Sequence, residues 1–181
     1  GPILLVATGD KRLAGVTLAG GESRFSIELK RPAQVVLSEN DSVFLADDRG
    51  EILRLDTDEG SKAKWKYRAG AQIRGISELD GRLIVSSYDN FLYSIGESSG
   101  HVNWKVRLPG RVRGTAVLDD RRLLIFVENS KTATAVIAES GRIDSQIQLD
   151  NEPIAAGSGG GRVYILSPVS VSAYSAGICT K

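Results

Sequence analysis

The most regular feature of the sequence is a short apolar segment that recurs at a fixed spacing. Apolar, strand-forming residues stand 40 positions apart at Ile3, Val43, Leu83, Leu123 and Val163, and the residues two positions later repeat in the same way. Self-similarity with a period of about 20 to 50 residues is typical of repeat architectures. The spacing therefore predicts five copies of one structural unit.

Each copy contains further strand-length segments, separated by short polar or glycine-containing turns. The segment directly after the repeated apolar one occurs at 13–18, 51–56, 91–95, 132–137 and 169–174. The next segment occurs at 25–29, 65–67, 104–108 and 143–149. A last segment leads into the following copy, at 33–37, 73–76, 112–117 and 153–156. Alternation such as Ile143, Ser145 and Ile147 places one apolar face against a neighbouring sheet. No stretch keeps a helical period over three turns, so we expect almost no helix.

Four short strands in about 40 residues is the period of a β-propeller blade. We therefore predict an all-β propeller that forms one domain over residues 3–181, with three full and two partial blades. The repeats are approximately 3–37, 38–77, 78–117, 118–157 and 158–181. This pattern fits a small five-bladed ring or a fragment of a larger propeller. An open wheel would expose apolar sheet faces and favour self-association through its open blade edges.

Composition excludes several classes of partner and site. The 23 basic and 22 acidic side chains leave a net charge of +1, so we expect no nucleic-acid partner. One cysteine and one histidine cannot form an internal disulfide or a structural zinc site. No apolar run reaches the ~18 residues of a membrane span, so this chain is not expected to insert into a membrane. The opening Gly1-Pro2 is typical of a cleaved affinity tag.

Two segments carry a more specific motif. They are LYSIGESSGHVNWK at 92–105 and LRLDTDEGSKAKWK at 53–66. Both resemble the blade motif of the pyrroloquinoline-quinone-like (quinoprotein-type) propeller repeats, in which a turn glycine precedes a tryptophan. The motif fades in the other copies, where Gln146 lies near the tryptophan position and Phe25 or Ser26 takes that place in the first copy.

The resemblance is closest to non-enzymatic propellers of the bacterial envelope, such as the lipoprotein subunit of the machinery that assembles outer-membrane β-barrels. It implies a periplasmic or otherwise exported protein.

The motif also has a direct physical reading. Gly60 and Gly100 supply turns that need a positive φ, and Trp65 and Trp104 then pack their indoles over the turn of their own copy, against the adjacent blade. We therefore interpret these four residues as structural, not as a ligand platform.

Catalytic chemistry has little support in the sequence. A quinone-dependent dehydrogenase of this type would need a larger closed wheel, a calcium site, a catalytic aspartate and a pair of adjacent cysteines, whereas Cys179 stands alone. The acidic clusters fall in predicted turns, at Asp47 and Asp48, at Asp56, Asp58 and Glu59, and at Asp119 and Asp120. His101 has no second histidine or cysteine nearby, and the glycine run at 158–162 reads as a hairpin turn. We expect no cofactor, no metal and no catalytic residues.

The remaining candidates for binding are Arg74 and Arg113. They occupy the same triplet type, Ile-Arg-Gly and Val-Arg-Gly, 39 residues apart, with Gln34 and Ile154 near the equivalent places in other copies. In a propeller this strand is innermost, so two arginines there could hold an anion or a partner's acidic side chain. The other interpretation is that they are solvated or pair with carboxylates of a neighbouring blade.

The sequence thus favours a non-enzymatic protein-binding or scaffolding propeller with a protein partner. The alternatives are a ligand-sensing or dimerising ectodomain of a larger receptor, and a fragment of a quinone-dependent dehydrogenase.

Overall fold

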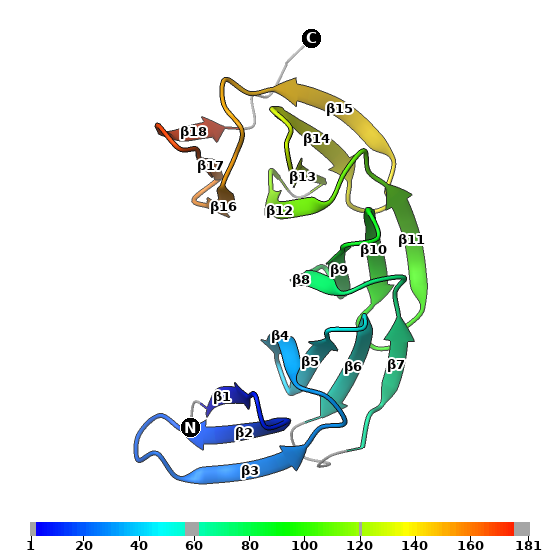
Figure 1. Ribbon diagram of the computed structural model, residues 1–181, viewed down its shortest axis with the longest axis vertical. Coiled ribbons are helices and arrows are strands. Elements are labelled where there is room, and N and C mark those ends of the chain that lie inside the picture. The colour runs from blue at the N-terminus through cyan, green and yellow to red at the C-terminus, as the bar shows by residue number, and fades with distance from the viewer. Residues whose placement is uncertain (1–2, 57–61, 120, 176–181) are drawn as a thin grey trace. The chain divides into compact units, whose positions relative to one another are not determined.

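The fold is built from β-strands alone. The computed structural model describes residues 3–56, 62–119 and 121–175, and within them eighteen strands form five antiparallel sheets, with no helix (Figure 1). Three sheets have four strands and two have three. The predicted all-β class and the predicted division into three full and two partial blades are confirmed. No helix in the described residues is long and apolar enough to cross a membrane.

Each sheet is one blade, and its strands follow one another in chain order across the sheet. Blade 1 is β1 (Ile3–Thr8), β2 (Arg12–Thr17) and β3 (Ser23–Glu28). Blade 2 is β4 (Ala33–Glu39), β5 (Ser42–Asp47), β6 (Glu51–Asp56) and β7 (Trp65–Arg68). Blade 3 is β8 (Ile73–Leu79), β9 (Arg82–Ser87), β10 (Phe91–Gly96) and β11 (Val102–Arg107). Blade 4 is β12 (Val112–Val117), β13 (Arg122–Val127), β14 (Thr132–Ile137) and β15 (Ile143–Gln148). Blade 5 is β16 (Ala155–Gly159), β17 (Arg162–Leu166) and β18 (Val171–Ser175).

The predicted segments match these strands to within a few residues. β16 begins at Ala155, two residues after the predicted start at 153, and ends at Gly159. Pro153 lacks an N–H for the sheet ladder, and the first such bond in this segment is from Ile154 N to Leu166 O (2.7 Å). Gly1-Pro2, Gly60 and Cys179 lie outside the described residues.

The chain forms two compact units, residues 1–89 with 95–101, and residues 90–94 with 102–181. In the first unit, blades 1 and 2 share an apolar core around Leu13, Ile27, Val43, Leu45 and Leu55. In the second unit, the corresponding core between blades 4 and 5 contains Leu124, Phe126, Ala133, Ala135, Val163 and Ile165. Burial of such side chains stabilises each junction at about 25 cal/mol per Å² of apolar surface.

The repeat spacing differs by one residue in the first copy. Leu5, Ala7 and Leu13 of blade 1 pack toward Val43 and Leu45 of blade 2, so Leu5 and Leu45 lie on opposite faces of their sheets. Equivalent residues would lie on the same face. The structure therefore aligns Leu4 with Val43 and Val6 with Leu45, a spacing of 39 in place of 40. A shift of one residue exchanges the two faces of a strand. The run Ile3–Leu4–Leu5–Val6 is apolar at every position, so no polar–apolar alternation shows which of its residues face the core.

Candidate functional site at the bulged start of the inner strands

The first strand of each complete blade begins with a β-bulge. The register shifts between Ala33 and Val35 in β4, between Ile73 and Gly75 in β8, and between Val112 and Gly114 in β12. The extra residues are Gln34, Arg74 and Arg113, the positions that the sequence singled out. These strands lie on the inner side of the blades, where β4 lies beside β1 and β8 in the first unit, and β12 beside β16 in the second. A bulge leaves its extra residue out of the ladder and redirects its side chain.

Buried serines of β9 hold the bulge that carries Arg74. The Ser87 hydroxyl donates to the carbonyl of Ala71 (3.2 Å), and the Ser86 hydroxyl donates to the carbonyl of Gly75 (3.3 Å). Both serines are buried, so these bonds are shielded from water. The backbone on both sides of Arg74 is therefore fixed by a rigid neighbouring strand.

Arg113 is engaged within its own unit. Its Nη2 lies 3.2 Å from Glu152 Oε1, and both side chains are about one-third exposed, at 31% and 37%. The same carboxylate oxygen accepts a hydrogen bond from the N–H of Asn129 (3.0 Å). Glu152 lies in the segment that leads into blade 5, so Arg113 is tied to the neighbouring blade and its charge is compensated.

Arg74 is exposed and, among the described residues, makes no ion pair or hydrogen bond through its side chain. Gln34, at the equivalent bulge of the neighbouring inner strand in the same unit, is also exposed. A guanidinium presents five N–H donors in a planar fork that matches a carboxylate or a phosphate. The structure thus separates two arginines that looked equivalent in the sequence: Arg113 has a partner, and Arg74 is free to bind one.

The turn carboxylates form hydrogen bonds within their own turns or ion pairs with nearby basic side chains. Asp47 Oδ1 accepts hydrogen bonds from the N–H groups of Arg49 (2.8 Å) and Glu51 (2.9 Å). Asp56 lies 3.3 Å from Lys64 Nζ. The described residues contain no group of three or more histidine, cysteine, aspartate or glutamate side chains arranged to hold a metal ion. Asp48 lies 3.5 Å from Nη1 of Arg31. Three further cluster members lie outside the described residues, namely Asp58, Glu59 and Asp120.

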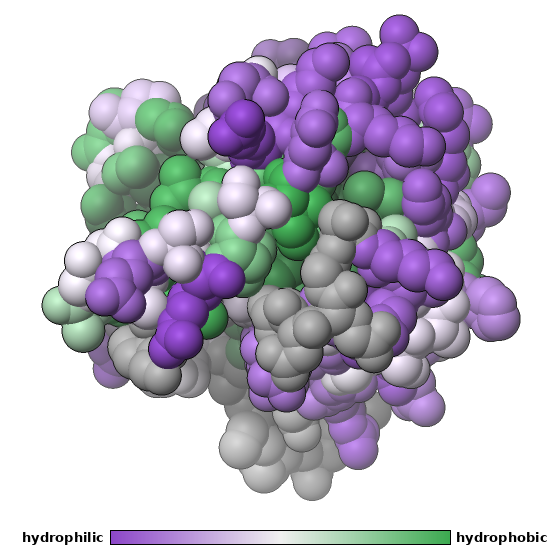
Figure 2. All heavy atoms as spheres, turned by 90° about the horizontal axis from the view of Figure 1, so that it is seen from below, coloured by the Kyte–Doolittle hydropathy of each residue, from purple (hydrophilic) through white to green (hydrophobic). Residues whose placement is uncertain are grey.

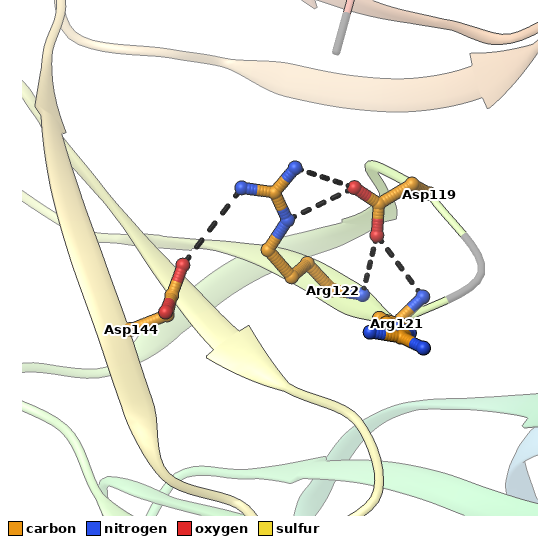
Figure 3. A network of polar contacts seen from close by, with 4 residues as sticks. All are labelled: Asp119, Arg121, Arg122 and Asp144. Carbon is orange, nitrogen blue, oxygen red and sulfur yellow. Dashed lines mark hydrogen bonds and ion pairs between the residues drawn. The ribbon is translucent and has the colours of Figure 1, made fainter. Parts of the chain in front are cut away.

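Asp119 forms the most extensive polar network (Figure 3). One carboxylate oxygen accepts bonds from Nε (2.9 Å) and Nη2 (2.6 Å) of Arg122, and the other accepts from the backbone N–H groups of Arg121 (3.0 Å) and Arg122 (2.8 Å). Arg122 Nη1 also lies 3.8 Å from Asp144 on β15. Burial alone would raise the pKa of Asp119, but the hydrogen bonds and the charge of Arg122 outweigh it, so this pKa lies below its ordinary value.

The Asp119 network predicts a pH-dependent contribution to stability. Because the folded-state pKa lies below the unfolded value of about 3.9, the contribution is present above about pH 4 and is lost as the pH falls through the folded pKa. Asp119→Asn should lower the free energy of unfolding by about 1 kcal/mol at pH 7, and the difference from wild type should shrink at acidic pH. Urea unfolding at pH 7, 4 and 2.5 measures this. Asp144→Asn, which removes only a 3.8 Å contact, is the control and should cost less.

The tryptophans of the motif lie over the turn of the following blade. Trp65 Nε1 donates to the carbonyl of Glu97 (2.9 Å), and a Cβ at Gly100 would lie 2.6 Å from its indole. Trp104 Nε1 donates to the carbonyl of Ala138 (2.9 Å), and a Cβ at Gly141 would lie 2.6 Å from its indole. The sequence grouped each tryptophan with the glycine of its own copy, whereas the structure places it on the glycine of the next.

The tryptophan position in blade 4 is also one residue from where the sequence placed it. Trp104 follows Gly100 by four residues, and four residues after Gly141 stands Ser145, which is exposed and pairs with Ala135. Gln146 is the next residue along the strand. Blade 4 therefore has no indole at this place.

Sequence reasoning did not single out Glu152, the partner of Arg113. These two residues are 39 positions apart and belong to different blades, so no local spacing connects them. The sequence indicated only that a carboxylate of a neighbouring blade was a suitable partner for the arginine, and it did not indicate which carboxylate.

Comparison with known proteins identifies the family. The model of the family described as outer membrane protein assembly factor BamB, a PQQ-like repeat family, matches residues 70–178, which is more than half of the chain. The chain belongs to this family. The matched part of this BamB-family chain contains both Arg74 and Arg113, and the predicted relationship to PQQ-like propellers is confirmed. No curated protein matches the sequence at a significant level.

Solved structures share the propeller fold with this BamB-family chain at low sequence identity. A chain of the Mitotic Checkpoint Complex has a TM-score of 0.84 and 10% identity, covering 98% of this chain and 58% of that one. The computationally designed Ika8 protein has a TM-score of 0.80 and 11% identity, covering 97% of this chain and 56% of its own. BBS1N in complex with ARL6DN has a TM-score of 0.77 and 15% identity, covering 93% and 55%. The chain thus spans little more than half the length of these structures.

Proposed function

We propose that this protein is a non-enzymatic, protein-binding propeller module of the bacterial envelope. The observation that carries the proposal is Arg74, an exposed guanidinium that a β-bulge and a buried pair of serines hold on an inner strand. Arginine is enriched among the residues that carry binding energy at protein interfaces. The partner we infer is a protein that presents a carboxylate to Arg74.

The family relationship supports the compartment and the class of partner. The family is described as an outer membrane assembly factor, which favours an exported, periplasmic protein. Two of the similar folds were solved as protein complexes, which is consistent with a propeller that works by docking proteins. Binding sites differ among proteins that share a fold, and in this chain Arg74 is the residue that we infer contacts the partner.

The test compares capture of envelope proteins by wild type and by Arg74→Ala, alone and combined with Arg113→Ala. A guanidinium at the centre of an interface contributes about 2 kcal/mol or more, so the affinity for the captured partner should fall about thirtyfold or more with Arg74→Ala. Quantitative mass spectrometry of pull-downs from a bacterial envelope extract measures the change. Arg107→Ala, which removes an exposed arginine from the outer strand β11, is the matched control and should capture the wild-type set. Capture by Arg74→Ala that equals wild type removes Arg74 from the binding surface.

The non-enzymatic part of the proposal has a separate test. Added pyrroloquinoline quinone with Ca²⁺ should not bind, because the single cysteine of the chain cannot form the paired-cysteine disulfide expected from quinone-dependent relatives. Titration followed by quinone absorbance and tryptophan fluorescence checks this. Saturable binding at micromolar concentrations would favour the dehydrogenase alternative.

A further inference from the structure

The outermost strand of a complete blade has one edge without a neighbouring strand. In a propeller the blades stack face to face, so this edge stays free whatever the number of blades. A free edge can pair with another chain, and proteins protect such edges with charged side chains, above all lysine. Hydrophilic side chains also surround the exposed apolar ones on the side of the molecule that Figure 2 shows. The charges on an outer strand therefore decide whether its edge can pair.

Blades 2 and 3 protect this edge with basic residues, and blade 4 does not. Two equivalent positions in each outer strand carry exposed basic side chains, Lys66 and Arg68 in β7 and Lys105 and Arg107 in β11. β15 has Gln146 and Gln148 at these positions, because Ser145 takes the place of the tryptophan. The one charged residue of β15 is Asp144. A strand with isoleucines and little charge is well suited to pairing with another strand.

The backbone of β15 offers hydrogen-bonding groups at this edge. Among the described residues, β15 ends its sheet, with β14 on one side and no strand on the other (Figure 1). The N–H of Leu149 donates to the carbonyl of Lys131 (2.7 Å), so Leu149 faces the β14 side. Alternate residues of an antiparallel strand face the same neighbour. The N–H and C=O groups of Gln146 and Gln148 therefore point away from β14.

We propose that the free edge of β15 pairs antiparallel with β15 of a second copy of this chain. Only residues that face outward can bond across the new edge, so Gln146 lies opposite either Gln146 or Gln148 of the second copy. The first register keeps residues 144–148 of both copies paired within β15 and places Asp144 opposite the uncharged Gln148. The second register places Asp144 opposite Asp150, where like charges repel. Charge therefore selects the first register.

The side chains of this register suit a pair of identical strands. The two Gln146 amides lie opposite each other on the twofold axis, where each can both donate and accept a hydrogen bond. Lysine at this position, as in β7 and β11, would bring two cations together on the axis, so the same pairing is unfavourable for those strands. Because the same residues of both copies meet, the contact is isologous and closes at a dimer.

This edge is separate from the site at Arg74. β15 belongs to the second compact unit and Arg74 to the first. Arg74→Ala should therefore leave the dimer unchanged, whatever its effect on the capture of other proteins.

Sedimentation velocity of the wild-type chain between about 1 and 300 μM tests the association itself. We expect a concentration-dependent shift from monomer to dimer and no larger species. Gln146→Lys combined with Gln148→Arg gives β15 the residue types of β7 and should raise the dimer dissociation constant about tenfold or more, because like charges meet at the axis. Ser26→Lys, at the equivalent exposed position of β3, adds a positive charge elsewhere and should leave the dimer unchanged.

A cysteine cross-link tests the register. Bonded residues directly opposite each other have Cα atoms about 5.5 Å apart, which is within the range of a disulfide. In a chain that also carries Cys179→Ser, mild oxidation of Gln146→Cys should therefore give a disulfide-linked dimer in high yield. Lys105→Cys, at the equivalent position of β11, is the control and should remain mostly monomeric.

Circular dichroism and melting temperature confirm that each variant is folded. If the double variant is less stable than Ser26→Lys, Gln146→Lys alone replaces it, with a smaller loss of affinity. A wild-type monomer at every concentration, a charged β15 variant that associates like Ser26→Lys, or equal cross-linking of Gln146→Cys and Lys105→Cys would each overturn the proposal.

Discussion

Replacing Trp104 with alanine is expected to lower the free energy of unfolding by about 3 kcal/mol, the lower end of the range for large core aromatics. The indole is half-buried, covers the turn at Gly141, and donates a hydrogen bond to the carbonyl of Ala138 (2.9 Å). The substitution removes both the apolar contact and the hydrogen bond, and it leaves that carbonyl without its donor. Urea unfolding followed by the fluorescence of Trp65 measures the change in the free energy of unfolding.

Trp65→Ala should have an effect of similar size in the first unit. Its ring lies 5.9 Å from the ring of Phe44, and its N–H donates to the carbonyl of Glu97. Trp104→Phe, which keeps an aromatic ring but loses the N–H, should cost about 1 kcal/mol. Ser145→Ala and Gln146→Ala change exposed side chains in the degenerate blade and should stay within about 0.5 kcal/mol of wild type. Wild-type unfolding midpoints in both tryptophan variants would show that the indoles do not stabilise the blades.

Gly100→Ala is expected to destabilise the protein by about 3 kcal/mol, from two separate causes. Gly100 has a φ of +70°, where an alanine costs about 1 kcal/mol in backbone strain. Its added Cβ would also lie 2.6 Å from the Trp65 indole, which must move, and overpacking of this kind costs about 2 kcal/mol. Thermal and urea unfolding of the variant measure the sum.

A second glycine separates the two causes. Gly81 has a φ of +71° but no atom within 4 Å of the position of an added Cβ, so Gly81→Ala carries the strain alone and should cost about 1 kcal/mol. The second unit offers the same comparison, with Gly141 (φ +72°) against Trp104 and Gly161 (φ +70°) in open space. Equal destabilisation by Gly100→Ala and Gly81→Ala would contradict the packing of the indole on the turn.

Much of the architecture follows from the sequence by itself, because a blade is a local object. Its strands are consecutive, and each is marked by apolar strand formers between turn residues. Ser42–Asp47 and Glu51–Asp56, for example, are separated by a turn in which the Asp47 carboxylate accepts a hydrogen bond from the N–H of Glu51 and Gly50 has a positive φ. The motif glycine and tryptophan were likewise visible, since few other residue types tolerate a positive φ or cover a turn.

Contacts between blades were beyond the sequence. The tryptophans of blades 2 and 3 lie on the glycine turn of the next blade, and no short-range spacing distinguishes that turn from the one in their own copy. In blade 1, the run Ile3–Leu4–Leu5–Val6 is apolar at every position, so either face fits the core by hydrophobicity. In the fold, Leu5 packs against blade 2, so Leu4 and Val6 lie on the opposite face of the blade 1 sheet.

For the candidate site too, the sequence determined the positions of the residues and the tertiary structure determined their contacts. The sequence determined that Arg74 and Arg113 occupy equivalent places at the start of inner strands, because both precede glycine at the same point of the repeat. Tertiary structure alone decided that Arg113 meets Glu152 across a blade junction while Arg74 stays exposed. The physical reason is range: strand position depends on neighbours within a few residues, whereas the neutralisation of a charge depends on whatever side chain the fold brings within about 4 Å.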